Sequence, residues 1–461
     1  MHDEDERAES WAASEFGHAV LGDPRRTARL VSMAEQLAIQ PAGRITRAFA
    51  VPAEREAAYR FIENEHISAD AIRDASRRAA ARRAAIHSEV IVPVDGVAFA
   101  VADRSKRFGP LGTKCQAKGA LGMSALALSP DGVPLGLLGQ EFWTRSTKRS
   151  PQYNQDKRPV TQRETGHWLT VLSQAQEVLR RDAPGTNPWY QLDRGGDCAD
   201  VLLHLLALGG DFTARACHNR VVTGGKLWER AASCTSLGSY RIPVRKPDAV
   251  PRTATIEVRA RRVELHLRPT PVTRSNVERR SLWVVEAREK EQRRDRVRWR
   301  LLTTKPAETF EQAREIITAY TRRWRIEELH LAWKSGACGI EQSWLRTPER
   351  FFKWATITVA VAARLERIKL LSRTQPNLSA LDEFSRDEID AAIALRKPKA
   401  VRFGATPTLE EMVRWVADIG GYTGKSSGGP PGIRVISRGF DRVEAAASAI
   451  ASLRNDPAFR G

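Results

Sequence analysis

The sequence predicts a mixed α/β fold, in which a sheet carries helices on its faces, an antiparallel β insertion interrupts the series and helical segments flank both ends. Apolar runs bounded by glycine predict the strands, and the elements follow in the order β-β-β-α-β-α-β. At 461 residues the chain is long enough for two or three domains. We expect a helical region over 1–70, a core over 71–370 with the insertion at about 225–305, and a helical region over 371–461.

The first expected helix lies in LGDPRRTARLVSMAEQLA. Asp23 as the cap and Pro24 at the first helical position form a typical start, and apolar residues follow at helical spacing. Arg25, Arg26 and Arg29 occupy the first turns, where positive charge opposes the helix dipole. They suggest contacts with phosphates, and a solvent-facing basic turn is the alternative. A second helical piece, PAEREAAYRFIENEHISADAIRDASRRAAARRAA, ends in a basic run.

Three consecutive strands follow. EVIVPVDGVAFAV and GALGMSALALS are nearly continuous apolar runs, and VPLGLLGQEFW comes after the turn Pro130-Asp131-Gly132. The series continues with TGHWLTVLSQAQEVLRR as a helix, NPWYQLDRGG as a strand and turn, CADVLLHLLALGG as a helix and DFTARACHNRVV as a strand. The tail is expected to be helical; its loop GGYTGKSSGGPPG is one residue short of the GxxxxGK[ST] spacing, which favours a plain turn over a phosphate-binding loop.

The β-rich section carries much of the positive charge. From Arg261 to Arg300 there are 13 Arg or Lys against 6 Asp or Glu, alternating with strand-forming residues. A solvated antiparallel sheet with charged outer faces is one interpretation. The other is a platform that meets phosphates, with Trp283 and Trp299 available to stack on bases.

The whole chain is basic. Its 74 Lys and Arg against 55 Asp and Glu give a net charge of +19, which favours a polyanionic partner such as nucleic acid or an anionic membrane surface. No apolar run approaches the roughly 18 residues of a membrane span, and the start MHDEDERAES lacks a signal-peptide pattern. We therefore expect a soluble intracellular protein without a membrane partner.

The cysteines do not form a metal-binding or disulfide pattern. They are Cys115, Cys198, Cys217, Cys234 and Cys338, an odd number without CxxC spacing. We expect reduced thiols, mostly in the core. Cys217 beside His218 is a weak candidate metal ligand.

The segment YTRRWRIEELHLAWKSG, from Tyr320 to Gly336, predicts a helix with two different faces. At 100° per residue, Tyr320, Arg323, Glu327 and Lys334 fall within an arc of about 60°. The opposite face carries Ile326, Leu329 and Trp333, which suits burial against a core.

Three acids stand out as ligands for a hard cation such as Mg²⁺, which prefers carboxylates and water. Asp95 lies inside the first apolar run, where an unpaired acid is costly to bury. Asp193 ends the strand WYQLD, where ligands gather in open α/β sheets. Glu327 lies on the two-faced helix. The alternatives are that Asp95 starts a turn with Gly96 and that Asp193 caps the nearby helix.

These residues carry a resemblance. The chain resembles the IS4 family of bacterial DDE transposases, most closely its Tn5-like members. Tyr320, Arg323, Glu327 and Lys334 match the family signature Y-(2)-R-(3)-E-(6)-K, and the segments LGDPRRTARL, AAYRFIENEHISADAI, GLLGQEFW, LDRGGD and RWRLLTTKPAE are similar too. The matching segments run from residue 21 to about 345 in the same order.

The resemblance implies an RNase H-like core with a DDE triad, which falls on Asp95, Asp193 and Glu327. It also implies an N-terminal domain that recognises transposon ends, a β insertion before the helix with Glu327, and a C-terminal dimerisation region. The family's Trp that stacks on a flipped-out base matches Trp299. The DNA-binding residues that we expect are Arg25, Arg26, Arg29, Tyr59, Arg60, Trp299, Tyr320, Arg323 and Lys334.

The implied function is cut-and-paste transposition by nicking, hairpin formation and strand transfer. Asp95 would bridge two Mg²⁺ ions, with Mn²⁺ as a substitute, while Asp193 and Glu327 would each complete one side. The expected partners are double-stranded DNA, as transposon ends and target, and a second copy of the chain in the DNA complex. The expected location is the bacterial cytoplasm, at the nucleoid.

Two positions depart from the family pattern. The family follows its first Asp with Thr-Thr, whereas here Gly96 and Val97 follow Asp95, and LDRGGD has glycines where the family has Glu-Ala. The lost hydroxyls would weaken the support of the metal ligands. The alternatives are therefore a catalytically weakened DNA-binding relative, such as an inhibitor or regulator, and a nuclease of the same fold without strand transfer.

Overall fold

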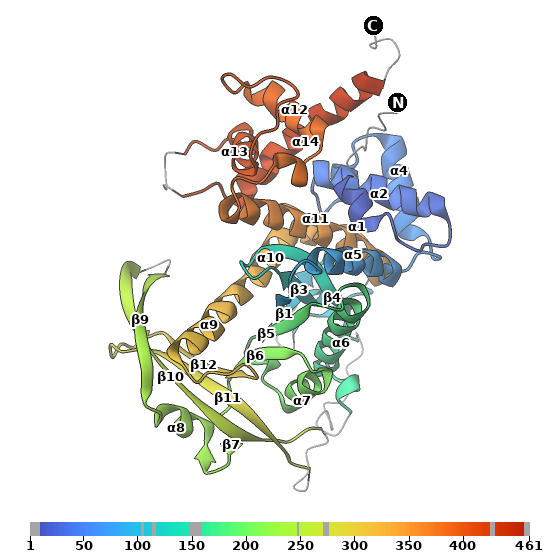
Figure 1. Ribbon diagram of the computed structural model, residues 1–461. Coiled ribbons are helices and arrows are strands. Elements are labelled where there is room, and N and C mark those ends of the chain that lie inside the picture. Colours follow the sequence, from blue (N-terminus) through green and yellow to red (C-terminus); the bar gives the residue numbers. More distant parts are fainter. Residues whose placement is uncertain are drawn as a thin grey trace.

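The computed structural model describes residues 10–102, 106–112, 117–146, 159–246, 249–270, 276–424 and 429–455. Within these ranges one 12-stranded sheet crosses the molecule, with the β insertion at one end and the N- and C-terminal helices together at the other (Figure 1). Cys115 and residues 425–428 of the glycine-rich loop lie outside the described ranges. The four described cysteines are free thiols, as expected.

The N-terminal helices are α1 (Trp11–Phe16), α2 (Pro24–Ile39), α3 (Ile45–Ala48), α4 (Pro52–Glu63) and α5 (Ala69–Ala84). The expected start of α2 is confirmed, because the Asp23 carboxylate accepts from the N–H of Arg25 and Pro24 is the first helical residue. The second helical piece, expected to be continuous, is two helices. Ser68 caps α5 by accepting from the N–H of Ala71 at 3.1 Å, so the polar segment between α4 and α5 turns the chain.

The core elements appear in the expected order: β1 (Glu89–Ala100), β2 (Gly109–Pro110), β3 (Lys118–Leu128), β4 (Pro134–Trp143), α6 (Thr165–Asp182), β5 (Asn187–Leu192), α7 (Ala199–Leu208) and β6 (Asp211–Arg215). β1 pairs antiparallel with β3 and parallel with β5, and β5 pairs parallel with β6. The sheet is therefore mixed, as the sequence predicted.

Alternation along β1 divides the core into two layers. Val90, Val92 and Val94 pack into the apolar cluster that includes α6 and α7. Ile91 and Phe99 pack into the other cluster, with the long helix α11 (Pro348–Thr374). Because successive side chains of a strand point to opposite faces, Asp95 projects to the α11 side.

The insertion comprises β7 (Val221–Val222), β8 (Gly225–Lys226), α8 (Leu227–Ala232), β9 (Ser236–Lys246), β10 (Ala249–Leu267), β11 (Glu278–Glu289) and β12 (Arg298–Thr303). Its last strand, β12, pairs antiparallel with the core strand β6. The buried hydroxyls of Thr213 and Thr303 lie 3.1 Å apart across this seam. The insertion thus extends the core sheet, which places β12 beside the ends of the core strands.

The segment expected to be one helix from Tyr320 onwards is not continuous. α9 (Phe310–Thr321) ends in the 3₁₀ turn η4 (Arg322–Trp324), and α10 (Arg325–Lys334) follows. The prediction of a single helix is wrong because angles counted at 3.6 residues per turn do not hold across a tighter 3₁₀ turn. The apolar stripe is confirmed, since Ile326, Leu329 and Trp333 are buried.

The C-terminal region continues from α11 through α12 (Arg386–Arg396), α13 (Leu409–Ile419) and α14 (Ile433–Asn455). α11 is buried along most of its length, because it packs against β4, α5 and α10 and against the C-terminal helices. None of the helices in the described ranges combines the length and apolar character that crossing a membrane requires.

Candidate active site

Asp95 and Asp193 lie on neighbouring strands. Val94 is paired with Leu192 in the parallel β1–β5 ladder. Asp95 follows Val94, and Asp193 follows Leu192, so the two acids leave this pair at the same level of the sheet. The Asp95 carboxylate accepts from the N–H of Gly96 at 2.8 Å, but β1 continues to Ala100, so the alternative that Asp95 begins a turn is wrong.

Asp193 leaves the end of β5 and enters a 3₁₀ turn, η3 (Arg194–Gly196). Its carboxylate accepts from the N–H of Gly195 at 2.8 Å. Asp193 therefore caps this short turn and not the nearby helix α7, which begins after Cys198, so the alternative interpretation is wrong for the helix. This bond engages one oxygen and leaves the side chain half-buried at the strand end.

Arg323 brings Glu327 to Asp95. One guanidinium nitrogen lies 2.6 Å from Glu327 Oε1, and another lies 3.4 Å from Asp95 Oδ2. Glu327 is in the first turn of α10, which packs against β1. Three acids from β1, the end of β5 and α10 therefore meet on one side of the sheet.

Burial and the two neighbouring acids raise the proton affinity of Asp95. The pKa of Asp95 rises to about 6, because burial penalises its charge and because Asp193 and Glu327 add negative charge nearby. Arg323 and the Gly96 N–H act in the opposite direction without cancelling the shift. Asp95 shares Arg323 with Glu327, so at Asp95 the arginine does not offset the burial and the neighbouring acids.

The donor set fits a divalent cation. Glu327 Oε2 is buried, and within the described part of the chain it has no hydrogen-bond partner. A buried acceptor without a partner is costly, and carboxylate oxygens are the ligands that hard cations prefer. The spare oxygen and the raised pKa of Asp95 both indicate a position where a cation would be stabilised.

Tyr320 and Trp299 form one wall beside the acids. Tyr320 is buried, its ring lies 5.9 Å from the Arg323 guanidinium carbon, and it contacts the Trp299 ring edge-on with centroids 5.5 Å apart. Trp299 is half-buried on β12. Tyr320, at the C-terminal end of α9, covers part of the ring.

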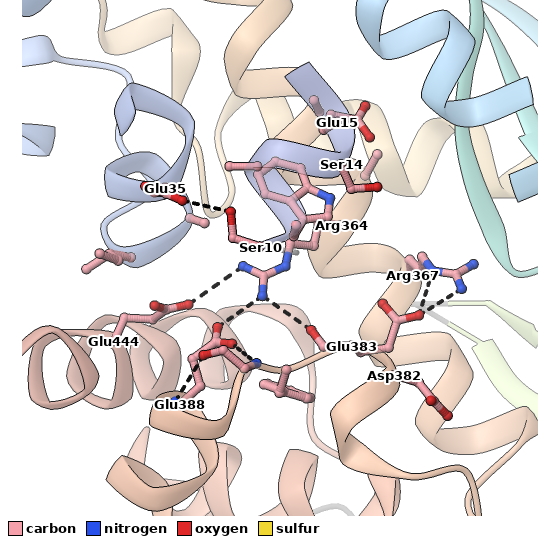
Figure 2. Close-up of a pocket in the computed structure, with 18 of the residues that line it drawn as sticks. Ser10, Ser14, Glu15, Glu35, Arg364, Arg367, Asp382, Glu383, Glu388 and Glu444 are labelled. Atoms are coloured by element: carbon pink, nitrogen blue, oxygen red, sulfur yellow. Dashed lines mark hydrogen bonds and ion pairs between the residues drawn. The ribbon is translucent and has the colours of Figure 1, made fainter. Parts of the chain in front are cut away.

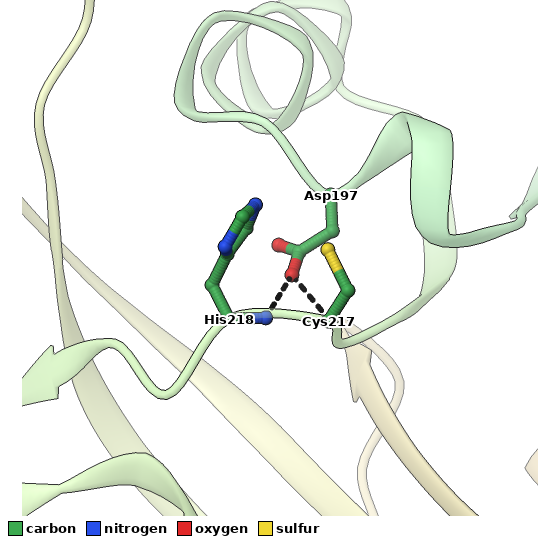
Figure 3. Close-up of side chains that lie close together, drawn as sticks. All are labelled: Asp197, Cys217 and His218. Carbon is green, nitrogen blue, oxygen red and sulfur yellow. Dashed lines mark hydrogen bonds between the residues drawn. The ribbon is translucent and has the colours of Figure 1, made fainter.

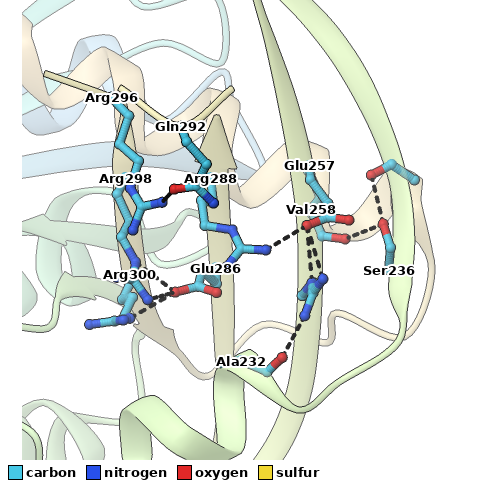
Figure 4. Close-up of polar contacts among 12 residues, drawn as sticks. Ala232, Ser236, Glu257, Val258, Glu286, Arg288, Gln292, Arg296, Arg298 and Arg300 are labelled. Atoms are coloured by element: carbon cyan, nitrogen blue, oxygen red, sulfur yellow. Dashed lines mark hydrogen bonds and ion pairs between the residues drawn. The ribbon is translucent and has the colours of Figure 1, made fainter. Parts of the chain in front are cut away.

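The arginines beside Trp299 point to the opposite face of β12, as alternation predicts. Arg298 and Arg300 both bind Oε1 of the buried Glu286 at 2.8 Å, and Arg288 on the next strand binds Glu257 at 3.0 Å (Figure 4). Three arginines of the predicted basic platform, Arg288, Arg298 and Arg300, are thus engaged in ion pairs across strands. Trp283, the other candidate for stacking, is half-buried against the apolar core.

Arg215 is a residue that sequence reasoning missed. It ends β6, and burial lowers the pKa of its guanidinium, with further lowering from Arg194 and Arg323, while Tyr320 acts in the opposite direction. It therefore belongs to the same cluster of charges. Its place at the end of the core strand DFTAR was the signal, since ligands gather at strand ends.

Lys334 lies apart from the three acids in its contacts. Its ammonium lies 3.6 Å from Glu341 Oε1, and the same oxygen accepts from the N–H of Ala100 at 2.8 Å. Of the four signature residues, Arg323 contacts both Tyr320 and Glu327, and Lys334 is tied through Glu341 to the end of β1.

The N-terminal candidates lie on α2 and α4. Arg25 is 91% exposed beside Asp23, and Arg26 donates to the carbonyl of Leu21 at 2.9 Å. Arg29 binds Glu54 at 2.8 Å. On α4, Tyr59 is half-buried and the exposed Arg60 pairs with Glu56.

A separate cavity of about 540 Å³ lies among α1, α11 and the C-terminal helices, and contains none of the three acids (Figure 2). Arg364 crosses it to bind Glu388 at 3.0 Å and Glu444 at 3.6 Å. The positive charge of Arg364 in this cavity is thus already balanced by carboxylates of the protein, unlike the negative charge of the acids around Asp95.

Three family models match the chain. Residues 8–67 match a model described as transposase DNA-binding, residues 174–363 match the transposase DDE domain, and residues 360–454 match the transposase Tn5 dimerisation domain. The DDE match includes Asp193 and Glu327, and Asp95 lies before it.

Among solved structures, the chain is similar to a cryo-EM structure of the piggyBac transposase synaptic complex with hairpin DNA. The two share 9% sequence identity and a TM-score of 0.38, over 76% of this chain and 67% of that chain. This likeness is distant.

Proposed function

The chain belongs to the Tn5-like DDE transposases of the IS4 family and is a metal-dependent DNA transposase with an RNase H-like core, and on this premise we propose that Asp95, Asp193 and Glu327 are its catalytic carboxylates. The observation that carries the proposal is that Arg323 joins Asp95 to Glu327, that Asp193 follows the strand paired with that of Asp95, and that one Glu327 oxygen has no partner in the described chain.

We propose Mg²⁺ as the metal, with two ions per site and Mn²⁺ as a substitute. Asp95, Asp193 and Glu327 would hold the ions through their carboxylates. When bound, the ions supply positive charge to the attacking and leaving oxygens of an in-line displacement at phosphorus. The Asp95 carboxyl must lose its proton first, because only the carboxylate is a ligand.

The first step is nicking at a transposon end. Water attacks the phosphorus, its bond to the 3′ oxygen breaks, and that oxygen leaves as a 3′-OH. This hydroxyl then attacks a phosphorus of the opposite strand and displaces the 3′ oxygen of the flanking DNA, which leaves as a 3′-OH, so that a hairpin closes the transposon end. Water opens the hairpin and frees the transposon 3′-OH again, which attacks a phosphorus of target DNA and displaces a 3′ oxygen of the target strand. Arg323, Arg215 and Lys334 are the cations available to hold the phosphates beside the acids, Arg by two-pronged contact and Lys as a point charge.

The other regions would bind and pair. DNA binding and dimerisation are properties of this family's domains, and the proposal assigns transposon-end recognition to residues 1–70, catalysis to 71–370 and dimerisation to 371–461. Arg25, Arg26, Arg29, Tyr59 and Arg60 would contact the ends. Two copies would act together on double-stranded DNA, at the nucleoid in the bacterial cytoplasm.

Trp299 is proposed to stack on a base flipped out beside the cleavage point. Its ring lies against Tyr320, next to Arg323, so a base extruded there would meet an aromatic surface close to the acids. Extruding a base relieves the tight bend of a hairpin. We therefore expect Trp299→Ala to slow the hairpin step more than the first nick, by about 5- to 150-fold for a contact of 1 to 3 kcal/mol.

The decisive experiment uses Asp95→Asn, Asp193→Asn and Glu327→Gln on a supercoiled plasmid carrying candidate end sequences. Each change removes a charge and little volume, so Mg²⁺-dependent nicking should fall by about 1000-fold or more while end binding persists. Glu328→Gln is the matched control, because this neighbour on α10 pairs with Arg325 instead. A variant of the three that nicks at the wild-type rate refutes its assignment.

The second candidate function, a catalytically weakened DNA-binding relative, is favoured by Gly96. A side chain there has room, because a Cβ would meet Met123 Cε and the carbonyl oxygen of Gly122 no closer than 3.7 Å. Gly96→Thr restores the family hydroxyl beside Asp95. If Gly96→Thr nicks DNA much faster than the wild type, the result favours a weakened wild-type protein. If the variant and the wild type nick at equal rates, the result favours full activity of the wild type. The same plasmid assay separates a nuclease, which cuts without joining.

A further inference from the structure

The turn that carries Asp193 is fastened to the end of β6 by another acid, Asp197. The Asp197 side chain is fully buried. Its Oδ2 accepts from the backbone N–H groups of Cys217 at 2.7 Å and His218 at 3.2 Å (Figure 3). Its Oδ1 accepts two bonds from the Arg220 guanidinium, at 2.6 Å and 3.1 Å.

This arrangement is saturated and does not suit a metal. The ligand atoms of Asp197, Cys217 and His218 lie within 4.8 Å of one another, which is close enough for a shared ion. However, four N–H donors already occupy the carboxylate. The Cys217 thiol contacts the carbonyl of Arg194 at 3.4 Å, and burial and Asp197 raise its pKa to about 11, so it is not the thiolate that a metal binds.

Asp197 also makes two backbone hydrogen bonds at the end of the short loop of residues 193–197. Its own N–H donates to the carbonyl of Arg194 at 3.3 Å, and its carbonyl accepts from Arg220 at 2.6 Å. Asp193 begins this loop and is oriented by the N–H of Gly195, in the middle of it. On the other side, Cys217 comes two residues after Arg215, so the same acid ties the end of β6 to the turn.

We propose that Asp197 is a positioning residue, which fixes the turn of Asp193 in the geometry that a divalent cation requires by binding Cys217, His218 and Arg220. The inference rests on the proposed function, in which Asp193 holds the metal. Groups that orient a metal ligand typically change metal affinity or activity by about 10- to 100-fold when they are substituted.

Asp197→Asn tests the inference, because it keeps the volume and removes the charge that Arg220 meets. We expect the Mg²⁺ concentration for half-maximal nicking to rise about 10- to 100-fold, with most of the maximal rate recovered at saturating Mg²⁺. Mn²⁺ binding to the protein, followed by electron paramagnetic resonance without turnover, should weaken by a similar factor. A lower melting temperature with unchanged metal dependence would mean a merely structural role and overturn the inference.

Arg220→Met provides the same test if Asp197→Asn does not fold, because it removes the guanidinium and leaves the backbone donors. His218→Ala and Cys217→Ser are matched controls: they remove side chains that could bind a metal and preserve the bonds to Asp197. Both should keep the wild-type metal dependence. A loss of Mn²⁺ affinity in either control, as large as that in Asp197→Asn, would indicate an ion at this cluster and overturn the inference.

Asp193→Asn, measured in parallel, separates the two proposals. If Asp193→Asn binds Mn²⁺ as the wild type does, the proposed role of Asp193 fails. If Asp193→Asn loses binding and Asp197→Asn does not, only the inference about Asp197 fails.

Discussion

Two arginines in this molecule lie between carboxylates, Arg323 at the ends of the core strands and Arg364 on α11, and their surroundings differ. Arg364 is buried with Glu388 and Glu444, and burial together with the charge of Glu388 raises the pKa of Glu444 well above its ordinary value. The shift favours the protonated form of Glu444, in which one arginine balances one carboxylate. The Arg364 cluster is electrically complete without a ligand.

The Arg323 cluster has a third acid and is more open. Asp95 and Glu327 are 19% and 32% exposed in their side chains, against 7% and 9% for Glu388 and Glu444. Its acids lie on β1, at the end of β5 and on α10. The packing of these elements against one another keeps the acids close together. The comparison teaches that an arginine between acids is a structural ion pair when charges balance in the interior, and a candidate cation site when acids exceed cations at an open strand end.

The largest expected effect is on stability at Arg364. Arg364→Met leaves a buried charge without a partner, which should lower the free energy of unfolding by about 3–5 kcal/mol. Arg323→Met should cost about 1–2 kcal/mol, and added Mg²⁺ should restore part of it, since the ion replaces the lost positive charge. Urea denaturation with and without Mg²⁺ measures both. Equal losses, with no response to Mg²⁺, would remove the distinction between the clusters.

The next largest expected difference between the two clusters is in how the stability of the protein depends on pH. The pKa of Asp95 is about 6 in the folded protein, against an ordinary value of 3.8 that applies to the unfolded chain. The folded state therefore binds this proton more tightly, and the metal-free protein gains stability as pH falls from about 6 toward 3.8. Asp95→Asn should therefore stabilise the metal-free protein at pH 7 by at most about 3 kcal/mol, with the gain vanishing near pH 4. Thermal melts across this range measure it.

Glu444→Gln is the counterpart in the other cluster. Because the raised pKa of Glu444 favours its protonated form, which an amide resembles, Glu444→Gln should change stability at pH 7 by less than about 1 kcal/mol. A gain at pH 7 as large as that of Asp95→Asn would show that Glu444 is charged and that the Arg364 cluster also lacks a cation.

Mg²⁺ should stabilise only one of the two clusters. At ten times its dissociation constant a ligand adds about 1.4 kcal/mol to the free energy of unfolding, which calorimetry detects as a higher melting temperature. The increase should disappear in Asp193→Asn and persist in Glu388→Gln. If Mg²⁺ still raises the melting temperature of Asp193→Asn, the ion binds at a site that does not include Asp193.

The smallest expected effect concerns arginines on the surface. Arg25 is almost fully exposed, whereas Arg29 pairs with Glu54. If Arg25 contacts a phosphate, Arg25→Ala should reduce the salt dependence of end binding by about 0.9 in log K against log[salt]. Arg29→Ala should reduce it less, because Glu54 competes for the guanidinium. Unchanged slopes in both would leave a solvent-facing basic turn.

The sequence alone determined the elements and their candidate chemistry. Glycine-bounded apolar runs predicted β1, β3 and β4, and the Asp23-Pro24 start predicted α2, because periodicity and turn chemistry act within a few residues. The acids Asp95, Asp193 and Glu327 could be selected from their places on separate elements, and the signature spacing gave the family.

The tertiary structure decided which of these groups meet and which are covered. Arg323 lies 228 positions from Asp95 in the chain. Arg215 lies near Arg323 only because β6 ends beside β5, the strand that pairs with β1. The 3₁₀ turn before α10, the packing of Trp299 on Tyr320 and the pairing of β12 with β6 depend on contacts between distant segments. Local periodicity fixes which face of an element is apolar; strand register and helix docking, which depend on the whole core, fix where its polar face points.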